Sequence, residues 1–362
     1  MWKLHFWLTV ALTLLLVPVC HMARLRLGDF SYVPGFLIGW VAQSILWAGF
    51  LYQFGVPGAW TTMRRDWKRM LVALEIPLLV IPLFAFVAHN LTIGVMISGI
   101  GLIALEFFYR RGNWKAAASV ILPWLYLAFG IQLAFLYNCA IVSARPFNLY
   151  DPLFQRLDML LFRISVSGIS HASAALYAPA ELIYYAIGGV MGAALLFLCL
   201  AGDRRAAFQM SGAILLSYYF SLAVFYLWPS HGPYSLAAWR FPPGMVTGAV
   251  QHASYSSAAA LYHHTGWMNP VLGYFVAFPS VHVAQPFIAG WFLRRWKRVS
   301  QIIFVYCALL VPSIVILQWH YFVDIVAGLA IAGLAIAIVS RVPARATAEQ
   351  PALELKGVAT AS

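Results

Sequence analysis

The chain has 362 residues, of which 63% are hydrophobic and only 9% are charged. Because a soluble domain is typically about 25% charged, this composition excludes a soluble fold and predicts an all-α, polytopic membrane protein. The net charge of +12 is explained by basic residues in short loops, so it does not predict a nucleic-acid partner.

Ten apolar stretches are candidates for membrane-spanning helices, each of which needs roughly 20 residues. They cover residues 4–21, 34–54, 70–88, 91–109, 116–138, 178–201, 206–228, 281–293, 300–317 and 321–340. The first resembles a signal peptide, but no small-residue cleavage site follows it, so we expect an uncleaved span. The eighth is short, and we expect its helix to begin upstream, near Tyr274.

The distribution of basic residues supports the count of ten spans. With the N-terminus inside, 17 of the 23 Lys and Arg residues fall in cytoplasmic segments, as the positive-inside rule requires. A missed or added span would exchange the sides of every later loop. We therefore expect both termini to be cytoplasmic and the membrane to be the plasma (inner) membrane.

Two long segments lie on the side that has few basic residues. In residues 139–177, the stretch 157–162 has apolar residues at helical spacing and predicts a helix along the membrane surface. Residues 229–273 are rich in Ala, Pro, Ser and His and predict a loop that acts as a lid or substrate gate.

Two polar motifs stand at the edges of apolar runs. The first reads Phe-Pro-Ser-Val-His over residues 278–282, and the second reads His-Tyr-Phe-Val-Asp over residues 320–324. Histidines and a carboxylate at a membrane boundary are costly unless they have partners or a function. Because His282 opens the eighth span and His320 closes the ninth, antiparallel packing would bring both to the outer face.

These residue types suit phosphoryl transfer through a histidine nucleophile: one His attacks, an Asp orients it, and a second His protonates the leaving group. The four cysteines are scattered and show no CxxC or zinc-ligand spacing, so we expect neither a metal site nor a cofactor.

The two motifs resemble the PSxH and SRxxxxxHxxxD motifs of the type 2 phosphatidic acid phosphatase superfamily. Residues 279–282 match the first motif in full, and Ser313, His320 and Asp324 match the second in register. Ile314 stands where the family has arginine, and the family's earlier KxxxxxxRP motif is not found. In both departures, and in the HYFxD motif at residues 320–324, the chain resembles the branch of inositol phosphorylceramide synthase-like phosphotransferases.

The resemblance implies a role for each matched residue. His320 would attack phosphorus and become phosphohistidine, and Asp324 would hold the far nitrogen of its ring. His282 would protonate the departing oxygen and then deprotonate the incoming hydroxyl. Ser280 and nearby backbone N–H groups would bind phosphate oxygens at a helix N-terminus.

A phosphate site also needs cations or strong donors around the phosphate oxygens, and the arginine expected at position 314 is absent. We expect Arg145 or Arg240 to supply the cation, although Arg145 would also suit a lipid-headgroup anchor. The segment that contains His231, Gly232 and Tyr234 resembles an outer motif of the branch and is expected to bind substrate.

Asp151 and Asp158 belong to the same branch pattern and are expected near the substrate. The alternative reading for both carboxylates is helix capping or pairing with Arg156.

The resemblance divides the chain into a four-span region (1–115), a six-helix catalytic core (116–342) and a disordered cytoplasmic tail (343–362). It implies a membrane enzyme that moves a phosphorylated, inositol-phosphate-like headgroup from a phospholipid to a lipid or glycan hydroxyl on the extracytoplasmic face. The alternative within the superfamily is a lipid phosphate or polyprenyl (pyro)phosphate phosphatase. A transporter or flippase is the alternative from another class, but no paired broken helices in two related halves support it.

Overall fold

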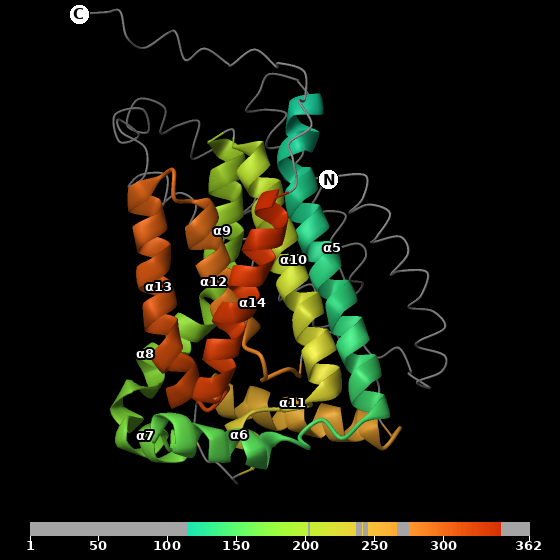
Figure 1. Cartoon of the computed structure of the whole chain (residues 1–362), viewed down its shortest axis with the longest axis vertical. Helices are drawn as coiled ribbons and strands as arrows, with labels where there is room; N and C mark the ends of the chain where they lie inside the picture. The colour runs from blue at the N-terminus through green and yellow to red at the C-terminus, as the bar shows by residue number, and fades with distance from the viewer. Residues whose placement is uncertain (1–113, 202, 237–240, 242–244, 266–274, 342–362) are drawn as a thin grey trace, which may run out of the picture.

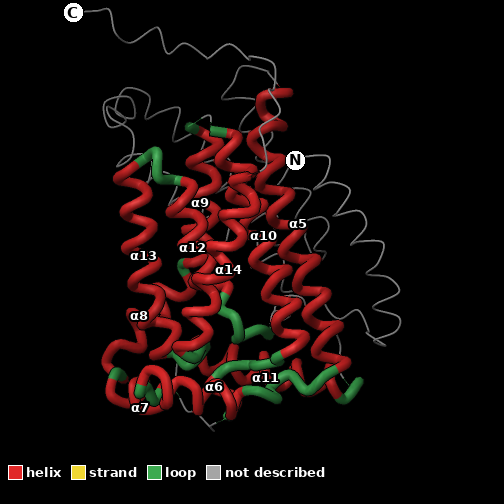
Figure 2. Tube along the Cα trace, viewed as in Figure 1, coloured by secondary structure: helices red, strands yellow, loops and turns green. Residues whose placement is uncertain are grey.

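The computed structural model describes residues 114–201, 203–236, 241, 245–265 and 275–341. Over these residues the protein consists of helices and loops, with no strand among them (Figures 1 and 2). The first four predicted spans and the C-terminal tail lie outside the described residues. The number of ten spans and the outer domain boundaries therefore remain predictions.

The long helices form a bundle whose axes run roughly in one direction (Figure 1). They are α5 (Trp114–Ala144), α8 (Tyr177–Tyr185) followed by α9 (Ile187–Leu200), α10 (Arg204–Leu227), α12 (Val281–Phe292), α13 (Lys297–Ile316) and α14 (Phe322–Arg341). Four stretches of the described residues are long and apolar enough to cross a membrane: Ala174–Cys199, Arg204–Leu227, Lys297–Ile316 and Phe322–Arg341. The protein is thus an all-α membrane protein.

Shorter helices lie across one end of this bundle (Figures 1 and 2). They are α6 (Asp151–Leu157), a π-helical turn over Asp158–Phe162, α7 (Val166–Ala172) and α11 (Val246–Tyr262). The helix expected over residues 157–162 is therefore present. The side chains of Leu160 and Leu161 on its outer side are 77% and 63% exposed.

The prediction of a loop over residues 229–273 was wrong for the part that forms α11. The buried face of α11 consists of Thr247, Gln251, Ser254, Ala258 and Leu261, which recur at helical spacing. Most of them are small or polar, so hydropathy gives no signal there. A run of 17 residues without proline was the signal that could have been used.

The eighth span also begins later than expected. Helix α12 starts at Val281, and residues 275–280 are a buried loop rather than a helical extension toward Tyr274. The residue before a proline is disfavoured in the helical region, so Phe278 cannot continue a helix into Pro279. With 12 residues, α12 is about 18 Å long, and buried non-helical backbone makes up the remaining depth.

Close approach of α14 to this loop depends on a glycine. A Cβ added at Gly328 would lie 2.3 Å from the carbonyl oxygen of Ser280, whereas a Cβ at Gly333 would meet nothing within 4 Å. Gly328 lies one turn after Asp324 on the buried face of α14. The buried face of α14 therefore carries both the Asp324 carboxylate and the glycine at which the 275–280 loop approaches the helix.

Gly328→Ala should destabilise the protein by about 1–3 kcal/mol, because the backbone of Ser280 would have to move. Gly333→Ala is the matched control, since the same helix gains a better helix former without a clash and should be stabilised by up to about 1 kcal/mol. Unfolding in detergent measures both effects. Equal stability of the two variants would contradict the close approach.

Candidate active site

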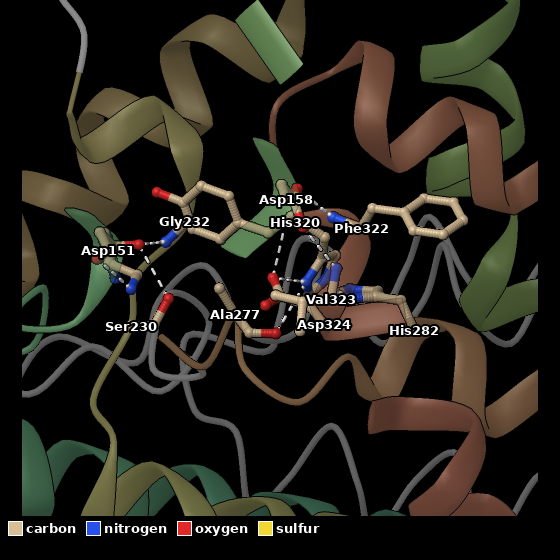
Figure 3. Close-up of polar contacts among 12 residues, drawn as sticks. Asp151, Asp158, Ser230, Gly232, Ala277, His282, His320, Phe322, Val323 and Asp324 are labelled. Atoms are coloured by element: carbon tan, nitrogen blue, oxygen red, sulfur yellow. Dashed lines mark hydrogen bonds and ion pairs between the residues drawn. The ribbon is translucent and has the colours of Figure 1, made fainter. Parts of the chain in front are cut away.

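The two predicted motifs meet at the end of the bundle where the short helices lie (Figure 3). The Nδ1 atom of His282, in the first turn of α12, lies 3.0 Å from Nε2 of His320, which precedes α14. His320 Nδ1 lies 2.9 Å from the carbonyl oxygen of Ala277 and 3.3 Å from Oδ2 of Asp324. The two histidines are 38 positions apart in the sequence, and the fold brings their rings into contact.

The partners of His320 determine where its proton lies. A backbone carbonyl only accepts hydrogen bonds, so Nδ1 of His320 must donate to Ala277. Burial lowers the pKa of His320 to about 3, which keeps the ring neutral at pH 7. The lone pair of the neutral ring therefore lies on Nε2, the atom that faces His282.

The proton on His282 follows from the same reasoning. Because Nε2 of His320 accepts, Nδ1 of His282 must donate to it. Nε2 of His282 is then an acceptor, and the Tyr184 hydroxyl lies 3.3 Å from it. Tyr184, on α8, was not singled out from the sequence, because one tyrosine among many on apolar helices carries no motif.

Two carboxylates satisfy the first backbone N–H groups of α14. Asp324 Oδ2 accepts from Tyr321 N at 2.8 Å, while Asp158 accepts from Phe322 N at 2.7 Å and from Val323 N at 2.9 Å (Figure 3). These N–H groups have no intrahelical partner, and a negative charge at a helix N-terminus is favourable. Asp158 thus holds the helix that follows His320 from 164 residues away.

This geometry agrees with the capping alternative for Asp158, although the helix that it caps is distant in sequence. Burial raises the pKa of its carboxyl group, and the two backbone N–H bonds lower it. Its two oxygens are used on α14, so the described contacts assign Asp158 to the support of the site.

The N-terminus of α12 is arranged differently. Its N-cap residue, Ser280, makes no side-chain capping bond, and its buried hydroxyl has no partner among the described residues. The Ser280 N–H donates to the backbone carbonyl of Asp324 at 3.0 Å, which joins the two motifs through the main chain. The first N–H groups of α12 therefore remain available for an anion.

Asp151 organises the segment that follows α10. Its carboxylate accepts from the Ser230 hydroxyl at 2.9 Å and from the N–H groups of His231 and Gly232 at 2.9 and 2.8 Å (Figure 3). Burial raises the pKa of Asp151 to about 7 against the opposing effect of these three bonds. Gly232 adopts φ +116°, and a Cβ there would lie 2.6 Å from the Trp319 carbonyl oxygen.

His231 and Tyr234 are also tied into the protein. The Tyr234 hydroxyl lies 2.6 Å from His231 Nε2, and His231 Nδ1 lies 3.3 Å from the Phe275 carbonyl oxygen. Burial lowers the pKa of His231 to about 3. These residues, which the sequence predicts to bind substrate, therefore brace the 275–280 loop, whose Ala277 carbonyl holds His320.

Of the two predicted cations, only Arg145 belongs to the described residues, and its contacts are not with the histidines. The guanidinium group of Arg145 donates to the Tyr226 carbonyl and lies 5.1 Å from the centre of the Tyr226 ring, at the end of α10. Arg240 lies outside the described residues, and Ile314 is fully buried among apolar side chains. Over the described part of the chain, no group of three or more His, Cys, Asp or Glu residues is placed to hold a metal ion.

Comparison with known families identifies the superfamily of this chain. The model of the PAP2 superfamily, the type 2 phosphatidic acid phosphatases, matches residues 157–338. The chain belongs to the PAP2 superfamily. The match includes both histidines, and membership supports a lipid phosphatase or phosphotransferase kind of activity. No curated protein and no solved structure matches this PAP2 chain, so no nearer relative narrows the activity.

Asp158→Asn should weaken the N-terminus of α14 by about 1–2 kcal/mol and lower kcat, because an amide supplies only one acceptor and no charge. Asp203→Asn is the matched control: Asp203 accepts from Ala206 N at the start of α10, at the other end of the bundle. Turnover and thermal unfolding measure both variants. If both lost activity to the same degree, Asp158 would have no particular connection to the site.

The buried His231 should make stability depend on pH. Its pKa is about 6.5 when unfolded and about 3 in the protein, so the unfolded chain binds more protons between these values and stability falls as the pH falls. His231→Gln removes this contribution. From pH 6 to 4, the wild type should lose about 1.4 kcal/mol more per pH unit than the variant. Urea unfolding in detergent measures the slopes, and equal slopes would contradict a neutral buried ring.

Proposed function

We propose that this protein is a membrane phosphotransferase that moves a phosphorylated headgroup between lipids through a phosphohistidine at His320. The observation that carries the proposal is the orientation of the His320 ring. The Ala277 carbonyl and the Asp324 carboxylate contact Nδ1 of His320, so the lone pair on its Nε2 is directed at Nδ1 of His282. A nucleophile, its orienting carboxylate and an acid–base group thus come from two segments of the chain.

In the first half-reaction, Nε2 of His320 forms a bond to phosphorus while the bond from phosphorus to the donor lipid's oxygen breaks. His282, which is protonated on both nitrogens once the phosphate anion is bound beside it, gives the proton on its Nδ1 to the departing oxygen and becomes neutral. The phosphorylated His320 ring keeps its Nδ1 proton and becomes cationic, and the Ala277 carbonyl and Asp324 stabilise that charge.

In the second half-reaction, the roles are reversed. His282, now a neutral ring with its lone pair on Nδ1, takes a proton from the acceptor hydroxyl and becomes cationic again, while the hydroxyl oxygen attacks phosphorus and the nitrogen–phosphorus bond breaks. His320 returns to its neutral form. Water in place of the alcohol would give hydrolysis, so the two activities differ only in the second substrate.

The substrate phosphate would be bound at the start of α12. The Ser280 hydroxyl is buried without a partner among the described residues, and the free N–H groups of the first turn of α12 point out of the same helix end. A helix N-terminus with a hydroxyl is a general anion site.

The distribution of charge supports an extracytoplasmic site. The basic residues at the start of α10 (Arg204 and Arg205) and between α12 and α13 lie at the helix ends opposite to the histidines. By the positive-inside rule, that end faces the cytoplasm. We therefore propose that the histidines face the outside of the plasma (inner) membrane, with both termini inside.

The preference for transfer over hydrolysis rests on the sequence. Ile314 replaces the arginine that the superfamily motif has at that position, and the HYFxD text resembles the inositol-phosphate-transferring branch. The donor is thus proposed to be a phospholipid with an inositol-phosphate-like headgroup, and the acceptor a hydroxyl-bearing lipid or glycan. No metal or soluble cofactor takes part in the proposed steps.

His320→Ala should abolish the covalent intermediate and lower turnover by at least about a thousandfold, as expected when a nucleophile is removed. The measurement is rapid quenching with a phospholipid labelled at phosphorus, followed by a test for an acid-labile, base-stable protein label. His252→Ala, which changes an exposed histidine on α11, is the control and should be labelled like the wild type. Persistent label in His320→Ala would exclude His320 as the nucleophile.

The acceptor is tested with the same labelled donor. Purified protein is incubated with the phospholipid alone and with an added lipid alcohol, and the products are separated. A transferase yields the labelled acceptor lipid only in the second mixture. Equal release of water-soluble phosphate in both mixtures, without labelled acceptor, would replace the transferase by a phosphatase.

A further inference from the structure

Two N–H donors immediately before His320 are buried without a hydrogen-bond partner among the described residues. They are Nε2 of Gln318 and Nε1 of Trp319, and the Gln318 side chain is only 1% exposed. Nearly all buried polar groups in proteins are hydrogen-bonded, and an unbonded donor costs about 1–3 kcal/mol. Two such donors in consecutive residues directly before a reactive histidine are placed to bind a ligand of that site.

The backbone of Gln318 adds a second observation. After the last turn of α13, Gln318 N donates to Val315 O and Trp319 N donates to Ile314 O, and Gln318 adopts φ +58°. This is the Schellman arrangement, in which the left-handed residue is usually glycine. A buried glutamine there is conformationally unfavourable, so its amide group, rather than its backbone, explains its presence.

The Trp319 ring lies beside the reacting pair. It stacks on Tyr184 at 5.2 Å between ring centres and meets the edge of Tyr234 at 5.3 Å. Tyr184 also reaches Nε2 of His282 with its hydroxyl. The indole is therefore fixed between Tyr184 and Tyr234, one ring away from His282, and its N–H can only donate.

Donors without acceptors fit the oxygens of an anion. The nearby position that carries arginine in the superfamily motif is Ile314, and it lies in an apolar cluster. We propose that Trp319 Nε1 and Gln318 Nε2 are substrate-positioning donors that bind the phosphate oxygens, in place of that cation. The inference deepens the proposed function, since it names the residues that hold the phosphate to be transferred.

The first test is Trp319→Phe, which keeps an aromatic ring for stacking and removes the N–H. Trp296→Phe is the matched control, because Trp296 Nε1 is also buried without a partner in the described structure but precedes α13 at the opposite end of the bundle. The readout is the stabilisation of the full-length protein by inorganic phosphate in a thermal-shift titration. We expect about tenfold weaker apparent affinity in Trp319→Phe and no change in Trp296→Phe.

The second test is Gln318→Gly, which retains the left-handed turn and removes the amide. Its matched control is His264→Gly, because His264 has φ +54° in the same arrangement at the end of α11 and is exposed. Both variants should unfold at a higher temperature than the wild type. Only Gln318→Gly should also weaken phosphate binding, by about tenfold, and raise the KM for the donor lipid.

The outcomes separate the possible roles. Wild-type phosphate affinity in Trp319→Phe and Gln318→Gly would overturn the inference, as would a wild-type protein that phosphate does not stabilise. Wild-type phosphate affinity with slower turnover of a headgroup-bearing donor, but not of phosphatidic acid, would assign the donors to headgroup hydroxyls and overturn the phosphate assignment. Label persisting in His320→Ala would refute the phosphohistidine without affecting phosphate binding.

Discussion

The site depends on how the first backbone N–H groups of α14 are satisfied in a buried place. Asp324 and Asp158 accept from three consecutive N–H groups, which have no carbonyl partner within the helix. Once α14 is held in this way, the backbone before it fixes His320 at a definite depth. The short helices across the end of the bundle are therefore part of the site, since Asp158 belongs to the π-helical turn after α6.

A second support acts from the opposite side. Asp151 binds the turn over residues 230–232, Ser230 O accepts from Ala277 N, and Ala277 O accepts from the His320 ring. A carboxylate on α6 thus orients the nucleophile through two stretches of loop. Asp151 and Asp158, which are seven residues apart, thus both support the position of the His320 ring without contacting it. This explains how a reactive group can be held firmly where backbone is not helical.

In the described part of the chain, the apolar spans and the meeting of His282 with His320 could be predicted from the sequence, because span length, charge bias and antiparallel packing are strong constraints on a membrane chain. These constraints did not predict the partners of Asp158, the helix α11 or the start of α12. Asp158 acts on a helix 164 residues away, α11 buries small polar residues that hydropathy does not register, and α12 is shortened by a loop whose N–H groups bond elsewhere in the fold. Only the contact of Asp158 lacks a local sequence signal, because the proline-free run of α11 and the proline before α12 are local signals that hydropathy does not register.

The bond from Ser280 N to the Asp324 carbonyl joins the two motifs by main chain alone. Replacing the Ser280 side chain, except by proline, therefore leaves the bond in place. Side chains of both motifs can therefore be substituted while the two segments keep their relative position. The fold thus tolerates the replacement of its reactive groups. A fold of this kind can lose or alter its chemistry over evolutionary time without first losing its shape.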